Sequence, residues 1–104
     1  MPGFVVKLIA PRPTFAFDMS ADERTMMMQH AGYWAGLAKG GSVLAYGPVA
    51  DPVGAYGIGI IVAADLAAVE AMRDSDPAIL SGLGFSYDIA PMLRLVTPTA
   101  SYDA

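Results

Sequence analysis

The chain has 104 residues, 55% of them hydrophobic and 15% charged, and its formal net charge is −4. This length predicts one domain over residues 1–104, and the lack of cysteine excludes disulfides and thiolate chemistry. A chain this short buries only a modest core on folding. Its apolar content therefore exceeds what a lone small domain can easily cover.

The distribution of charge argues against a membrane and against nucleic acid. The longest nearly apolar run, residues 57–64, ends at Asp65 and is much shorter than the ~20 residues of a spanning helix. The first ten residues lack the layout of a secretory signal, so the cytoplasm is the expected compartment. The six Lys and Arg residues are scattered and form no basic stripe, so we expect no nucleic-acid partner.

The motif search predicts neither a metal nor a cofactor. One histidine and no cysteine make a zinc site improbable. Gly57 and Gly59 lack the third glycine of a dinucleotide-binding turn, and residues 39–42 have the wrong order and length for a phosphate loop.

The first half of the chain predicts a strand followed by a long helix. Residues 3–10 alternate in a strand pattern, and the prolines at 11 and 13 end the strand, with a loop continuing to Met19. Ser20 and Glu23 form a capping box, which opens a helix that reaches about Lys39. The apolar stripe of this helix consists of Met27, Trp34 and Leu37, and His30 lies on the same face between them.

The second half predicts three further strands. Residues 42–49 and 55–63 are joined by a type I turn over 51–54. Asp65 caps a second helix, and Asp76 before Pro77 starts a short helical turn. Residues 85–96 form the last strand, which completes a core of 3–96. The tail, residues 97–104, shows no periodicity and is expected to be mobile or docked on a partner.

The resulting order, β-α-β-β-α-β, predicts an α+β fold with a ferredoxin-like protomer. This layout is an antiparallel sheet with two helices on one face. Both sides of the predicted strands are apolar, yet two helices cover only one side. We therefore expect a homodimer in which a second copy covers the other face.

Two residues are candidates for proton transfer. His30 is the only histidine and lies beside the predicted core, where it either shuttles protons or serves as a hydrogen-bonded histidine at the core margin. Asp76 is explained by its capping role alone, but a carboxylate there is also able to orient an imidazole. The spacing does not reveal whether these two side chains meet.

Four further residues are candidates for substrate binding. Arg12 stands between two prolines, so it offers a stiff mount for a bidentate contact to a carboxylate, or else it is a solvated arginine. Asp51 suits turn chemistry as well as binding. Tyr33 and Trp34 belong either to the core or to a pocket wall.

Several short motifs occur together in order along the chain. They are LIAPRP (8–13), MSADE (19–23), HAGYW (30–34), GPVADPVG (47–54), DP (76–77) and PM (91–92). Over about residues 3–95 this set resembles the YCII-related family of the dimeric α/β-barrel superfamily.

The resemblance implies a barrel formed by two protomers. It also implies a pocket in which a histidine and an aspartate, here His30 and Asp76, act together as the proton-transfer pair. Elimination of hydrogen chloride from a chlorinated aromatic intermediate is associated with the family. Isomerases and cofactor-free oxygenases occur in the superfamily, so the fold alone does not select the reaction.

Two hypotheses of function follow. In the first, the protein is a cofactor-free lyase or isomerase: His30, oriented by Asp76, moves a proton of a small aromatic or dienone-like substrate, and Arg12 anchors an anionic substituent. In the second, the dimer is a non-catalytic module that binds a small ligand or assists assembly.

Overall fold

Four antiparallel strands form the main sheet. The computed structural model describes residues 1–104 and contains β1 (Gly3–Ile9), β2 (Val43–Val49), β3 (Tyr56–Val62) and β4 (Ser86–Pro91). Their order across the sheet is β2-β3-β1-β4. The first strand, β1, therefore lies inside the sheet, next to the edge strand β4. The predicted α+β class is confirmed.

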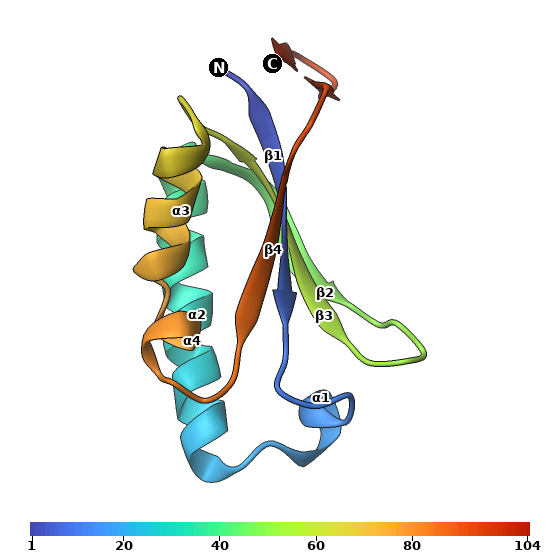
Figure 1. Cartoon of the computed structure of the whole chain (residues 1–104), viewed down its shortest axis with the longest axis vertical. Helices are drawn as coiled ribbons and strands as arrows, with labels where there is room; N and C mark the ends of the chain where they lie inside the picture. The colour runs from blue at the N-terminus through green and yellow to red at the C-terminus, as the bar shows by residue number, and fades with distance from the viewer.

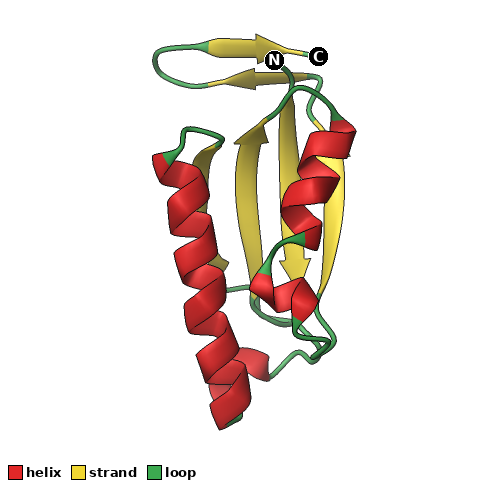
Figure 2. Cartoon of the chain, turned by 90° about the vertical axis from the view of Figure 1, so that its left-hand side faces the viewer, coloured by secondary structure: helices red, strands yellow, loops and turns green.

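The helices lie on one face of this sheet (Figures 1 and 2). They are α2 (Ala21–Lys39), α3 (Leu66–Asp74) and the single turn α4 (Pro77–Leu80). The predicted capping box begins α2, since the Glu23 amide donates to Ser20 Oγ at 3.1 Å and the Ser20 amide donates to Glu23 Oε1 at 2.8 Å. Asp65 caps α3 as predicted, by accepting from the Ala68 amide.

Two apolar clusters join the sheet to the helices. The larger one combines Phe4, Val6 and Ile61 of the sheet with Trp34 of α2 and Val69 of α3. The smaller cluster, Leu8, Met26 and Ala78, lies toward the end of β1 and the start of α4. The space between these clusters, beside α2, is where the candidate site lies.

A one-turn helix, α1 (Phe15–Asp18), occurs where a loop was predicted. Asp18 accepts hydrogen bonds from Arg12 Nε at 2.8 Å and from Thr14 Oγ1 at 2.6 Å, which close the turn. The Phe15 ring is buried against the edge of Phe85, with ring centroids 5.0 Å apart. Because these contacts come from side chains and from a residue far along the chain, helical periodicity over four residues did not reveal them.

The C-terminal segment also differs from the prediction. The expected strand over 85–96 breaks after β4, where Pro91 lacks an amide donor, and Leu93 is 94% exposed instead of facing the core. A hairpin follows, formed by β5 (Arg94–Val96) and β6 (Ser101–Asp103). The tail therefore contains a strand, and Thr97 and Ala100 close its turn through a 2.8 Å backbone hydrogen bond.

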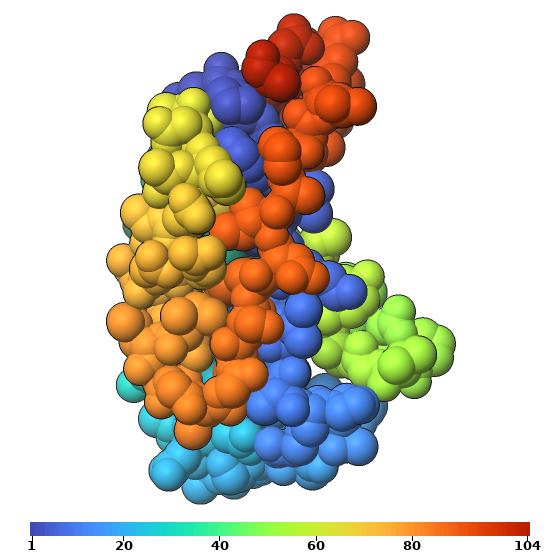
Figure 3. Space-filling view, in the orientation of Figure 1, coloured from blue at the N-terminus to red at the C-terminus, as the bar shows by residue number.

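The second face of the sheet carries no helix. Val5 lies opposite Ile60 and Ala90 on this face, while Lys7 lies opposite Ile58 and Asp88, so apolar and charged side chains are mixed. The outline of the molecule is concave on this side, between the C-terminal hairpin and the β2–β3 loop (Figure 3). None of the helices combines the length and the apolar character needed to cross a bilayer.

Candidate functional site

Asp76 is the centre of a buried polar cluster. The residue is 0% exposed and caps α4, where its Oδ1 accepts from the Ala78 amide at 2.9 Å, so the predicted capping role is confirmed. Its carboxylate also accepts from His30 Nδ1 at 2.9 and 3.0 Å, from Trp34 Nε1 at 2.9 Å and from the Tyr87 hydroxyl. We call the four side chains of Asp76, His30, Trp34 and Tyr87 the Asp76 cluster.

Three elements bring these side chains together. His30 and Trp34 are four residues apart on α2, so they project from the same face in consecutive turns. Tyr87 points from β4 toward the helices, because it lies opposite the inward-facing Leu8 of β1. The start of α4 supplies Asp76 between them. Residues that are 46 positions apart in the sequence thereby share one hydrogen bond.

The hydrogen bonds determine the charge of the carboxylate. Burial alone would raise the pKa of Asp76, but hydrogen bonds from His30, Tyr87, the Ala78 amide and Trp34 outweigh burial and lower that pKa. Burial and, after it, the hydrogen bond to Asp76 raise the pKa of Tyr87, so its hydroxyl stays protonated and donates. Asp76 is therefore an ionised acceptor that is surrounded by donors.

An ionised carboxylate fixes the tautomer of His30. Because the carboxylate only accepts, Nδ1 of the imidazole carries a proton, and in the uncharged tautomer with that proton the lone pair is on Nε2. Nε2 makes no hydrogen bond to another residue. Every side-chain nitrogen or oxygen that is buried in this structure has a hydrogen-bond partner. Nε2 is consequently accessible, in a side chain that is 16% exposed.

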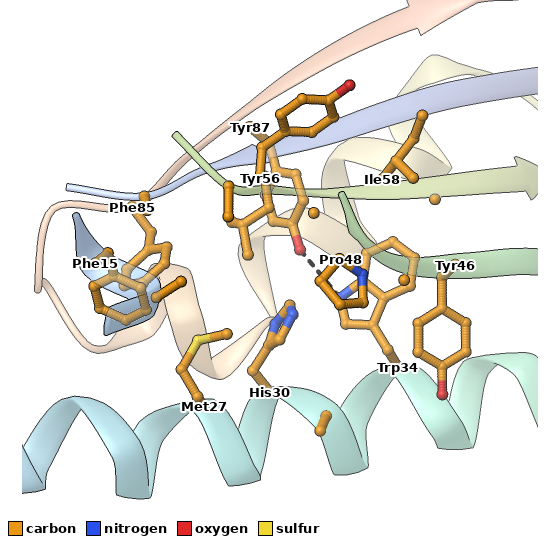
Figure 4. Close-up of a pocket in the computed structure, with 18 of the residues that line it drawn as sticks. Phe15, Met27, His30, Trp34, Tyr46, Pro48, Tyr56, Ile58, Phe85 and Tyr87 are labelled. Atoms are coloured by element: carbon orange, nitrogen blue, oxygen red, sulfur yellow. Dashed lines mark hydrogen bonds between the residues drawn. The ribbon is translucent and has the colours of Figure 1, made fainter. Parts of the chain in front are cut away.

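A cavity of about 350 Å³ adjoins His30. His30 extends into it from α2, between Met27 and Trp34, and a dashed line marks the Tyr87–Trp34 hydrogen bond (Figure 4). Most of the lining is apolar, and none of it is a charged side chain. The lining side chains include Leu8, Phe15, Met27, His30, Trp34, Tyr46, Pro48, Phe85 and Tyr87.

Arg12 lies outside this cavity and is held by two carboxylates. Its Nη1 and Nη2 each donate to Glu23 at 2.8 Å, and its Nε donates to Asp18 at 2.8 Å. The guanidinium therefore ties the segment that contains α1 to the start of α2. Its donors are engaged within the protein, which leaves the sequence-based role in substrate binding without structural support.

Two other candidates also lie apart from His30. Tyr33 donates to the Met72 carbonyl at 2.6 Å and joins α2 to α3. Asp51 accepts from the Val53 amide at 2.9 Å in the β2–β3 connection, where the Gly54 amide also donates to the Asp51 carbonyl, as the predicted turn requires. Of the four candidate binding residues, only Trp34 lines the cavity.

Tyr87 belongs to the site but was not singled out from the sequence. It belongs to the last predicted strand, where nothing in the sequence marks it as a functional residue. A buried tyrosine hydroxyl usually has a hydrogen-bond partner, so a tyrosine on the core face was the available signal. The sequence did not indicate which partner it has, because Asp76 is 11 residues away and on another element.

The Arg12–Glu23 contact predicts an acid sensitivity. Hydrogen bonds from Arg12, and after them the one from the Ser20 amide, lower the pKa of Glu23 from 4.5 to about 2. The unfolded chain therefore takes up this proton first, and the contribution of Glu23 to stability is complete above pH 4.5 and is lost as the pH falls toward 2.

Replacing Glu23 with glutamine keeps the capping geometry but removes the titrating group. We expect the melting temperature of Glu23→Gln to fall less steeply than that of the wild type over this acid range, as followed by circular dichroism. Equal slopes for the two proteins would contradict this assignment.

Comparison with known proteins agrees with the motifs in the sequence. The model of the YCII-related domain family matches residues 4–93, which is most of the chain. A search of curated proteins finds no match to this chain. The matched range contains β1 to β4, both elements that supply His30 and Asp76, and the whole Asp76 cluster. The chain therefore belongs to the YCII-related domain family.

Proposed function

We propose that this cavity is the active site of a small cofactor-independent enzyme, a lyase or isomerase in which His30 transfers a proton. One observation carries the proposal: a buried, ionised Asp76 holds Nδ1 of His30 while the free Nε2 is accessible beside an apolar cavity. A base that is oriented by a second group and that adjoins a hydrophobic pocket is the arrangement expected for general base catalysis.

The proposed reaction begins with removal of a proton and needs no other reactant. Nε2 takes a proton from carbon or hydroxyl of a small aromatic or dienone-like substrate, and the pair of electrons stays on the substrate. The electrons then expel a leaving group, or the proton returns at another atom of the same molecule. Asp76 stabilises the imidazolium that forms in between, as an adjacent carboxylate does in other histidine-dependent enzymes.

Nitrobenzisoxazole provides a test that needs no knowledge of the natural substrate. A base removes its ring proton, the N–O bond breaks, and a coloured nitrophenolate forms. We expect the wild-type protein to accelerate this opening beyond an equal concentration of free imidazole, because the cavity holds the ring against Nε2. We expect His30→Gln to lose about 100-fold or more in rate, the usual contribution of a general base.

The matched control is Tyr33→Phe, which removes a hydroxyl from the same helix, three residues after His30, outside the cavity. It should retain the wild-type rate. A His30→Gln variant as fast as the wild type would disprove the role of His30. A wild-type protein that binds the probe but leaves it intact would favour the second hypothesis, a ligand-binding or assembly module.

We also propose that the protein is a homodimer of ferredoxin-like protomers arranged as an α/β barrel. The strand order and the position of the helices support a ferredoxin-like protomer. The exposed sheet face supports the pairing, because it carries Ile58 at 37% exposure with Val5 and Ile60 beside it. A second copy on this face would remove these apolar side chains from water.

Sedimentation at micromolar concentration tests this pairing. We expect a dimer for the wild type and a monomer for Ile58→Lys, which puts a charge in the middle of the exposed face. Met28→Lys is the control, because Met28 is an exposed apolar residue on α2 and not on this face of the sheet. A wild-type protein that sediments as a monomer would contradict the proposed barrel.

A further inference from the structure

We infer that the cavity beside His30 accepts uncharged molecules and excludes anions. The inference deepens the proposed function by defining the charge of the substrate, and it rests on that proposal for the role of His30 as the base. It replaces the sequence-based expectation that Arg12 anchors an anionic group in this cavity.

The first observation is that no cation serves the cavity. Its lining contains no charged side chain. Arg12 lies over the ring of the lining residue Phe15 but is held by Glu23 and Asp18. Arg24 donates to the carbonyl of the lining residue Met19 at 2.6 Å, and neither arginine is itself part of the lining. Lys7 lies on the exposed face of the sheet and is not part of the lining, although its Nζ is 4.3 Å from the centre of the ring of Tyr56, which lines the cavity.

The remaining basic residues are farther from the cavity or paired elsewhere. Lys39 is at the last turn of α2, about 13 Å along the helix from His30. Arg73 donates to Asp74 at 2.8 Å, and Arg94 lies 3.4 Å from Asp103 in the C-terminal hairpin. A carboxylate or phosphate in the cavity would therefore be buried without a counterion, which is strongly unfavourable.

The second observation is the sign of the nearest charge. The ionised Asp76 lies directly behind His30 and has only neutral donors around it, namely Trp34, Tyr87 and the Ala78 amide. An anion next to the neutral imidazole would face this carboxylate across a single ring. The same anion would bind better to the imidazolium, but that form has no lone pair on Nε2 with which to take a proton.

The charge balance of the reaction points the same way. When an uncharged substrate gives its proton to Nε2, the new imidazolium lies between the Asp76 carboxylate and the new anion, so it has a negative partner on each side. A substrate that is already anionic would gain a second negative charge in an apolar cavity. The site therefore favours uncharged molecules in both binding and reaction.

Acetophenone and benzoate form a suitable pair of probes, because they are nearly isosteric. Acetophenone has a methyl group where benzoate has a charged oxygen. The indole N–H resonance of Trp34 reports their binding, since Trp34 is the only tryptophan and lines the cavity. At neutral pH we expect benzoate to bind at least about ten-fold more weakly than acetophenone. Benzoate that binds as tightly as acetophenone would overturn the inference.

Met27→Lys is the complementary variant, because Met27 lines the cavity one turn before His30. The added ammonium should raise the affinity for benzoate at least ten-fold. This gain is about as large as the expected difference between acetophenone and benzoate in the wild type, which has no cation in the cavity. A folded Met27→Lys protein without this gain would contradict the inference, and if the variant does not fold, the wild-type comparison decides alone.

His30→Gln separates this inference from the proposed function. The preference for acetophenone should persist in this variant, because it arises from the missing cation, whereas opening of nitrobenzisoxazole should be lost. A preserved preference without any catalysis in the wild type would refute the proposed function alone. Catalysis in a protein that prefers benzoate would refute the charge selection alone.

Discussion

Replacing Asp76 with alanine is expected to lower the free energy of unfolding by about 3–5 kcal/mol, because a buried donor left without its acceptor costs about 1–3 kcal/mol and the helix cap is lost as well. The change removes the acceptor of His30 Nδ1 and of the Tyr87 hydroxyl, and one of the two acceptors of Trp34 Nε1. It also removes the cap of α4. For a domain of this size the melting temperature should fall by roughly 15 °C or more. Thermal and urea unfolding followed by circular dichroism would measure the loss.

Asp65→Ala is the matched control for this prediction. Asp65 also caps a helix, but it is exposed and accepts only from the Ala68 amide. Its loss should cost about 0.5–2 kcal/mol, the typical contribution of a helix N-cap. If the two variants lost equal stability, Asp76 would be acting as a cap alone, and its hydrogen bonds to the side chains would contribute nothing measurable.

Replacing Gly59 with alanine is expected to cost about 1–3 kcal/mol, because it overfills a packed core. A Cβ at this position would lie 2.6 and 2.9 Å from two carbons of the Trp34 ring and 3.1 Å from a Val6 methyl carbon. The indole cannot move away freely, because its Nε1 donates to Asp76. We therefore expect both a lower melting temperature and a displaced indole N–H resonance.

Gly47→Ala provides the comparison on the neighbouring strand. Gly47 lies in β2, and a Cβ there would meet no atom within 4 Å. Because glycine in a strand is less favourable than alanine by roughly 0.5–1 kcal/mol, this variant should be as stable as the wild type or slightly more stable. A Gly59→Ala protein that matched Gly47→Ala in stability would contradict the tight contact with Trp34.

The elements with strong local signals were predictable. The capping box at Ser20 and Glu23 and the glycine after Lys39 marked both ends of α2, and Asp65 and Asp76 marked the starts of two other helices. Alternation of apolar residues located β1 to β3 to within one residue at each end, and it located the start of β4 but not its end. In each of these cases the signal and its cause lie within a few residues of the chain.

The elements that depend on distant partners were not predictable. α1 is held by the ion pair of Arg12 with Asp18 and by the packing of Phe15 on Phe85, just before β4, and no periodicity reports such contacts. The break after Pro91 and the hairpin beyond it were missed, because the apolar Leu93 and Val96 continue the pattern of the strand. Both of these residues are in fact exposed.

The candidate site was predictable in its residue types but not in its geometry. A lone histidine on the apolar stripe of α2 and an aspartate ahead of Pro77 each had a structural explanation, and only the fold brings them to 2.9 Å. Arg12 had the chemistry of an anion anchor, but Glu23 and Asp18 engage its guanidinium first. Tyr87 completes the Asp76 cluster from a strand whose sequence gave no sign of a polar partner.

The capping role of Asp76, taken together with the catalytic role that we propose for it with His30, has a consequence for how such proteins diverge. A lineage that no longer needs the chemistry is still under selection to keep the aspartate, since losing it would unfold the helix start and the indole packing. The imidazole is under no such pressure, because its loss leaves the remaining donors on the carboxylate. Drift away from activity should therefore show first as a changed histidine beside a retained aspartate, and the histidine is the better diagnostic of a working relative.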